Sequence, residues 1–214
     1  MLREAYIDLK YLLNRGYRKS YALDFVANHY RLSKEERYLL ARCVFSDEWV
    51  EEVRRKLLKP EELAGKSLAV DGFNVLITLE SLREGRAILC EDFLVRDLKY
   101  QGKYRLNENT GELLKNVARI LGELRVREVL FFYGRNVPKS GVVKGLTEKA
   151  LEEFGVRGEV RLVKSPDFEL KGFDVVSTAD TGIIAKVPRV FDLAHHTGKS
   201  MNLTPIPLEK LLKV

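Results

Sequence analysis

From about residue 66 onward, short apolar segments alternate with longer segments of helical periodicity, and this alternation limits the possible folds more than any other feature. Strands that are separated by helices favour a parallel sheet with helices packed on both faces. Five segments are predicted to be its strands: 68–71, 128–133, 160–163, 174–178 and 190–193. The sequence therefore predicts an α/β domain of three layers, with the sheet in the middle.

Residues 1 to about 58 show helical spacing only, without a strand signal. Ser33 and Glu36 form the pattern of a capping box at the start of one helix, and Lys59 with Pro60 ends the last one. We therefore expect an all-α helical unit at residues 1–64, followed by the α/β domain at residues 65–214.

The two middle helices of this helical unit are joined by only two residues, Arg31 and Leu32, which is roughly the geometry of a helix–turn–helix. Arg37 and Arg42 follow on the second of these helices, so this face is a candidate for docking nucleic acid. A small bundle with a solvated basic face produces the same pattern more often, and the sequence leaves both interpretations open.

The 214 residues carry a formal net charge of +6, which is compatible with a polyanionic partner without requiring one. No apolar segment approaches the roughly 20 residues that a membrane span needs, and the first residues lack the apolar core of a signal peptide. We therefore expect a cytoplasmic protein that makes no membrane contact, while homo-oligomerisation stays open. Cys43 and Cys90 are the only cysteines, and their spacing indicates neither a disulfide framework nor a zinc site.

Three aspartates follow predicted strands. Asp71 ends the first strand, where Gly72 permits a sharp turn into the next helix. Asp167 comes after the strand at 160–163, and Asp180 comes after the strand at 174–178. Ligands of open α/β sheets gather at the carboxyl ends of the strands, and these acids converge there if their strands are neighbours. Clustered carboxylates repel one another unless a cation neutralises them, and Mg²⁺ prefers such oxygen ligands.

Each of these aspartates has a simpler interpretation, because aspartate is a favoured N-cap of a helix. Three of them at one predicted edge nevertheless favour a metal site over capping alone. Asp92 and Asp97, in a hairpin-like segment, are candidates for a further metal ligand. Asn74, Ser177 and Thr178 are placed to hydrogen-bond the carboxylates or a water, or simply to satisfy local turns.

A loop with two glycines follows the predicted strand at 128–133, at the same edge as Asp71. Its basic residues are Arg135, Lys139 and Lys144, and they are suited to hold a nucleic-acid backbone. An ordinary solvated loop would have the same composition, so the pattern does not separate the two interpretations.

Three short motifs resemble those of the PIN-like nuclease superfamily, including its NYN branch: Asp-Gly-Phe-Asn after the first strand, a later Ser-Pro-Asp, and Ser-Thr-Ala-Asp-Thr-Gly-Ile-Ile. The resemblance covers about residues 66–195. The whole chain also resembles an uncharacterised, mostly archaeal family in which a short helical region precedes such a domain. The resemblance implies a parallel sheet between helices, bound Mg²⁺ or Mn²⁺, and cleavage of phosphodiester bonds, often in RNA.

By this resemblance, Asp71 is the metal ligand of the first strand, Asp180 with Thr178 matches the late strand end, and Asp167 matches the acid before that strand. The chain departs from the family pattern in one place. The second acid of the family lies on a helix downstream of the first motif. Here Asp92 and Asp97 lie in the hairpin-like segment, and Glu112 is on the next helix.

We therefore expect a Mg²⁺- or Mn²⁺-dependent nuclease that acts on RNA rather than DNA, with Asp71, Asp167 and Asp180 as its catalytic residues. The alternative is a protein of the same fold that binds nucleic acid without cutting it. Phosphotransfer on small nucleotides is a third hypothesis, because an acidic edge does not by itself define the size of the substrate.

Overall fold

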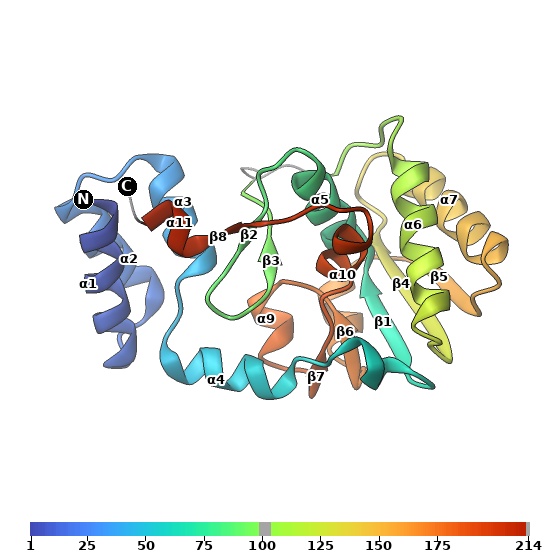
Figure 1. The fold of residues 1–214 in the computed structure, drawn as a ribbon, viewed down its shortest axis with the longest axis horizontal. Coiled ribbons are helices and arrows are strands. Elements are labelled where there is room, and N and C mark those ends of the chain that lie inside the picture. The colour runs from blue at the N-terminus through green and yellow to red at the C-terminus, as the bar shows by residue number, and fades with distance from the viewer. Residues whose placement is uncertain (99–103, 213–214) are drawn as a thin grey trace.

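The computed structural model of the chain describes residues 1–98 and 104–212 (Figure 1). Its first part is helical, as predicted. The elements are α1 (Leu2–Asn14), α2 (Lys19–His29), α3 (Lys34–Cys43), α4 (Asp47–Lys56) and the short 3₁₀ helix η1 (Pro60–Leu63). The capping box at the start of α3 is confirmed, because Ser33 and Glu36 exchange hydrogen bonds between side chain and backbone.

A five-stranded parallel sheet forms the centre of the α/β part, in the strand order β5-β4-β1-β6-β7. The strands are β1 (Ser67–Asp71), β4 (Glu128–Gly134), β5 (Gly158–Val163), β6 (Val175–Ser177) and β7 (Arg189–Val190). All four neighbouring pairs are parallel, which confirms the α/β prediction. The last predicted strand is shorter than expected, because Leu193 already begins a helix.

Helices cover both faces of this sheet, so the domain has the predicted three layers. Leu68 and Val70 of β1 join a core on the side of α5 (Gly72–Arg83), α6 (Thr110–Glu123), α7 (Ser140–Glu153) and α10 (Leu193–Ser200). Ala69 faces the opposite side and packs with residues of α4, α8 (Pro166–Leu170) and α9 (Thr181–Ile184). The alternation follows from the two-residue period of a strand.

A smaller sheet and the last helix join the α/β part to the helical unit. The sheet has the order β3-β2-β8, with β2 (Ile88–Leu89), β3 (Val95–Arg96) and β8 (Ile206–Pro207). Helix α11 (Leu208–Leu212) follows β8, and its Leu208 and Leu212 belong to the same core as Leu9 and Leu40. The end of the described chain therefore lies beside its beginning (Figure 1).

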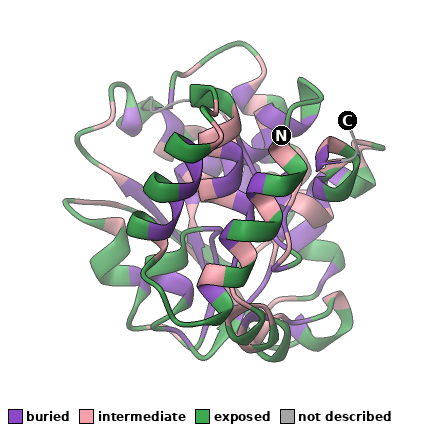
Figure 2. Ribbon diagram, turned by 90° about the vertical axis from the view of Figure 1, so that its left-hand side faces the viewer, coloured by how far each residue is buried: buried purple, intermediate pink, exposed green. Residues whose placement is uncertain are grey.

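Figure 2 views the molecule from the side of the helical unit, where buried and exposed residues alternate along each helix. Between α3 and the smaller sheet, Cys43 and Cys90 are joined as a disulfide, with their Cα atoms 4.4 Å apart. The spacing of these cysteines gave no indication of a link, because folding alone brings β2 against the end of α3. No helix within the described residues is long and apolar enough to span a bilayer.

Candidate functional site

The carboxyl ends of β1 and β6 lie side by side and bring two of the predicted aspartates together. Val70 of β1 is in register with Ser177 of β6. Thr178 Oγ1 donates a hydrogen bond of 3.1 Å to Asp71 Oδ2 and accepts one of 3.2 Å from the backbone N–H of Asp180. Thr178 therefore links the two aspartates, as a supporting residue was predicted to do.

Asn74 ties the start of α5 to the same place. Its backbone N–H donates to Asp71 Oδ1 at 3.4 Å, so Asp71 caps the helix. Its side-chain Oδ1 accepts a hydrogen bond of 3.0 Å from the backbone N–H of Ala179. Asp180 caps α9 in the same way, through a bond of 3.1 Å from Ile183 N–H. Both aspartates therefore cap helices, and each has a second carboxylate oxygen that does not accept the capping bond.

Asp167 reaches this edge by a route that differs from the prediction. The expectation was that the three strands are neighbours, but β4 lies between β5 and β1. After β5 the chain enters α8, which packs against both β4 and β1 and so carries the exposed Asp167 back towards Asp71. We name the carboxyl edge of the sheet with Asp71, Asp167 and Asp180 the aspartate edge.

The charges of the aspartate edge act on Asp71. Burial is the largest effect, and it raises the pKa of Asp71 to about 7. Hydrogen bonds from Thr178 and Asn74 oppose this rise, while the negative charges of Asp167 and Asp180 add to it. Among the described residues, none of the three aspartates has an ion-pair partner. A cation is therefore the component that would lower the free energy of this arrangement.

We expect the Asp71→Asn variant to be more stable than the wild type at pH 8 and equally stable near pH 4. The folded state holds the Asp71 proton more tightly than the unfolded chain, so the free energy of unfolding of the wild type falls as the pH rises from 3.8 to about 7 and then levels off. At about 1.4 kcal/mol per pKa unit, the gain in the variant is at most roughly 4 kcal/mol. Thermal unfolding in metal-free buffer measures it.

Mg²⁺ supplies the control for this stability experiment. A cation that binds the folded aspartate edge stabilises the wild type by mass action and leaves the variant nearly unchanged. A variant that is less stable than the wild type at pH 8 without metal would contradict the claim that burial destabilises the ionised Asp71 carboxylate in the folded state.

The aspartate edge is an open arrangement rather than a closed metal cage. Within the described residues, no three side chains of His, Cys, Asp or Glu are grouped closely enough to hold an ion by themselves. Mg²⁺ usually keeps several waters and is bound by one or two protein carboxylates together with substrate phosphates. The donor set of the aspartate edge fits such a loosely held Mg²⁺ or Mn²⁺ and does not fit a structural metal.

Asp92 and Asp97 do not supply a further ligand, contrary to the prediction, because both are engaged elsewhere. Asp92 is fully buried and accepts two hydrogen bonds from Arg96, of 2.5 and 2.7 Å. Asp97 accepts a hydrogen bond of 2.9 Å from Arg42. Glu112, on the helix where the family pattern places an acid, is ion-paired with Arg83 at 3.3 Å.

Other predicted roles also change. Ser177 points away from the carboxylates, since its Oγ accepts a hydrogen bond of 3.3 Å from Leu193 N–H. Arg37 is ion-paired with Asp24 on α2, and Arg42 with Asp97. The helix–turn–helix face therefore offers fewer free cations than its sequence suggests, which favours the bundle interpretation.

Gly72 is needed for space rather than for an unusual backbone angle. A Cβ atom at this position would overlap the ring of Tyr133, 2.5 Å from its Cζ. The glycine thus lets α5 start close against β4 and sets the position of Asp71. The chain turns here from β1 directly into α5, as the sequence predicted, and Gly72 makes this turn without a positive φ.

The basic loop follows β4 as predicted. Arg135 and Lys139 are exposed there, and Lys139 immediately precedes α7 with a φ of +62°. Lys144 lies within α7 and forms an ion pair of 3.5 Å with Glu148 on the next turn. Arg135 and Lys139 are therefore better placed than Lys144 to contact a polyanion.

Sequence reasoning missed Asp192, which lies between β7 and α10 and caps that helix, as Asp71 caps α5. Asp192 caps α10 through a bond of 2.9 Å from His195 N–H, and it also accepts one of 2.8 Å from Val95 N–H. Burial raises the pKa of its carboxyl group. The apolar residues Val190 and Phe191 before it were the sequence signal for an aspartate after a strand. Because its carboxylate accepts hydrogen bonds from the backbone of β3 and of α10, Asp192 links the smaller sheet to α10.

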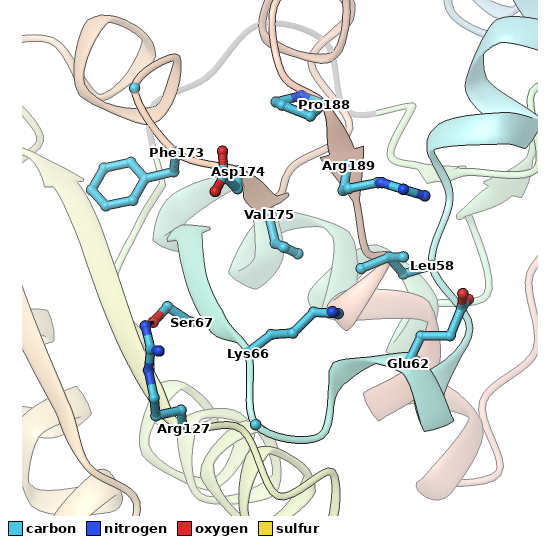
Figure 3. A pocket seen from close by; sticks show the side chains of 12 residues that line it. Leu58, Glu62, Lys66, Ser67, Arg127, Phe173, Asp174, Val175, Pro188 and Arg189 are labelled. Atoms are coloured by element: carbon cyan, nitrogen blue, oxygen red, sulfur yellow. Dashed lines mark hydrogen bonds between the residues drawn. The ribbon is translucent and has the colours of Figure 1, made fainter.

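A cavity of about 790 Å³ lies at the opposite edge of the sheet from Asp71 (Figure 3). It is lined at the starts of β1, β6 and β7 by Ser67, Val175 and Arg189. Asp174, the residue before β6, also lines it. The charged groups around it are exposed and of both signs, so its size alone does not make it the reactive site.

Fold and site together define a class: a three-layer α/β protein with a parallel sheet and an acidic carboxyl edge, fused to a helical unit. The chain belongs to the family described as a domain of unknown function, DUF5616, which matches residues 60–196. Residues 1–56 match a family described as a protein of unknown function, DUF434. An uncharacterised protein of Methanocaldococcus jannaschii is 41% identical over 185 residues, which are 86% of this chain and 88% of that protein. No solved structure matches the chain.

Proposed function

We propose that the protein is a Mg²⁺- or Mn²⁺-dependent phosphodiesterase that cuts RNA, as its resemblance to PIN-like nucleases implies. The observation that carries the proposal is the convergence of Asp71, Asp167 and Asp180. They come from three separate segments and share one edge. Burial first, and then the negative charges of Asp167 and Asp180, raise the pKa of Asp71, and no side-chain cation among the described residues is paired with it.

The side chains of the chain have distinct roles in this proposal. Thr178 holds Asp71 and Asp180 in a fixed relation, and Asn74 fixes the start of α5 against the end of β6. Arg135 and Lys139 lie on the loop after β4 and would hold the RNA backbone. A bound Mg²⁺ or Mn²⁺ would stabilise negative charge on the phosphate and lower the pKa of a water for attack.

Hydrolysis of a labelled single-stranded RNA in Mn²⁺ tests the proposal. The rate is expected to rise with pH, because Asp71 must lose its proton before it can help to hold a cation, and the midpoint should move to lower pH as the Mn²⁺ concentration increases. Ca²⁺ and a chelator serve as controls. A rate that is independent of metal, or absent at every pH in both Mg²⁺ and Mn²⁺, would contradict the proposal.

One observation favours the alternative of nucleic-acid binding without cleavage. The three aspartates are not grouped closely enough to hold an ion by themselves. That alternative predicts salt-dependent RNA binding with no hydrolysis in either metal.

A further inference from the structure

A second cavity lies between the helical unit and the aspartate edge, and the proposed function leaves it without a role. Its volume is about 490 Å³, within the range of about 300–1,000 Å³ that is typical of small-molecule sites. We name it the helical-unit cavity. The residues that matter in its wall are Tyr17, Lys19, Phe45, Trp49, Thr181 and Gly182.

Aromatic rings form one wall of the helical-unit cavity. The rings of Phe45 and Trp49 stack with their centroids 5.9 Å apart. The indole N–H of Trp49 donates to Asp92 Oδ2 at 3.1 Å, which fixes the orientation of the ring. Tyr17 is 58% exposed and lines the same cavity. A fixed aromatic wall beside an open tyrosine ring is the arrangement on which an unpaired base can stack.

Lys19 adds a positive charge to the cavity wall, in which Glu48 is the acidic residue. Its ammonium group lies 3.8 Å from the centroid of the Phe45 ring and forms no ion pair within the described part of the chain. Burial lowers the pKa of Lys19 to about 7, and the nearby cations Arg96 and Arg42 act in the same direction. Asp92 and Glu91 oppose that shift. A phosphate at the cavity would supply the missing negative charge.

The helical-unit cavity borders the aspartate edge directly. Thr181 and Gly182 follow Asp180 in the chain and line the cavity. A Cβ atom at Gly182 would lie 3.1 Å from Asp180 Oδ1, so the carboxylate stands next to the cavity wall. A strand whose phosphate lies at the aspartate edge could therefore place a neighbouring base in the cavity.

We propose that the helical-unit cavity binds one unpaired base of a single-stranded RNA, with Lys19 contacting the adjacent phosphate. This inference rests on the proposed function and names the substrate class for it. Duplex RNA is excluded from this mode, because its bases are paired and stacked within the helix. The helical unit and the aspartate edge thereby form one continuous binding surface.

Binding of a fluorescein-labelled, single-stranded oligoribonucleotide of ten nucleotides, measured by anisotropy with a chelator present, tests the inference. Tyr17→Ala is expected to raise Kd about tenfold, as for the loss of one base–aromatic stack. Lys19→Met is expected to weaken binding and to reduce the slope of log K against log salt by about one. The wild type should bind a duplex of equal length much more weakly.

Tyr21→Ala is the matched control. Tyr21 is 68% exposed and does not line the cavity, and it lies about 200° around α2 from Lys19. Its Kd should stay within about twofold of the wild type, and Tyr17→Phe should bind like the wild type, because both leave the stacking ring in the cavity. Circular dichroism confirms that each variant is folded.

Equal Kd values for Tyr17→Ala and Tyr21→Ala would overturn the inference, as would equally tight binding of duplex RNA. A dimer in sedimentation that Tyr17→Ala dissociates would show that a second copy fills the cavity, and would also overturn it. The proposed function fails separately. If RNA binding depends on Tyr17 but no RNA is cleaved, the cavity inference stands and the proposed nuclease activity fails. If RNA is cleaved but Kd does not depend on Tyr17, the nuclease activity stands and the cavity inference fails.

Discussion

Replacing Asp71 with asparagine is expected to lower the rate of RNA hydrolysis in Mn²⁺ by about 100- to 1,000-fold. This is the usual size of effect when one fixed electrostatic contact to a developing charge is removed. Asparagine keeps the shape of the side chain and can still accept from Asn74 N–H, so α5 should stay capped. The change removes the negative charge that a cation at the aspartate edge would require, and it replaces the oxygen that accepts from Thr178 by an amide NH₂ group.

Single-turnover rates at saturating RNA measure this effect and separate it from binding. The matched control is Asp174→Asn. Asp174 lies immediately before β6, at the edge of the sheet opposite to the aspartate edge. The control variant should leave the rate within about twofold of the wild type, because Asp174 lies outside the aspartate edge. An Asp71→Asn variant as active as the Asp174→Asn control would show that the aspartate edge is not the site of hydrolysis.

Replacing Arg96 with leucine is expected to lower the free energy of unfolding by about 3–5 kcal/mol, because it leaves the Asp92 carboxylate buried without its charged partner. The side chains of Arg96 and Asp92 are 1% and 0% exposed. Arg96 Nε also donates to the carbonyl of Ala179 at 3.0 Å, one residue before Asp180. Through this bond the Arg96–Asp92 pair holds the backbone next to Asp180 in place, although Asp92 is not part of the aspartate edge.

Chemical denaturation of Arg96→Leu and Arg161→Leu provides the comparison. Arg161 makes two hydrogen bonds of 2.7 Å to Glu159, but the side chains are 46% and 58% exposed. Loss of that surface pair should cost much less than loss of the buried pair, because solvent screens exposed charges. Replacing both Asp92 and Arg96 by apolar residues should recover much of the loss. Similar, small losses in both single variants would contradict the buried ion pair.

Most of the α/β part could be predicted from local sequence. Central parallel strands are buried on both faces, so they read as short apolar runs such as 68–71 and 128–133, and both are strands in the structure. The order of the strands could not be predicted, because it depends on which crossover passes over which strand. For that reason the path of Asp167 through α8, past β4, was not foreseen.

The candidate site was predictable only in part, since local spacing does not reveal partners that folding brings together. Asp71, Asp180 and Thr178 meet because β1 and β6 are neighbours, as their positions after strands suggested. Asp92 was misread although its partner Arg96 is only four residues away, because the sequence does not show that both side chains are buried together. The helical-unit cavity joins residues more than 130 positions apart in the chain, and no motif marks it.

The most direct test of the central claim is the anomalous scattering of a crystal soaked in Mn²⁺. The account predicts a peak at the aspartate edge, next to the Asp71 carboxylate and within reach of Asp167 and Asp180 directly or through waters. Crystals of Asp71→Asn should lack this peak. A fully occupied Mn²⁺ elsewhere in the molecule, with none at the aspartate edge of the wild type at pH 8, would contradict it.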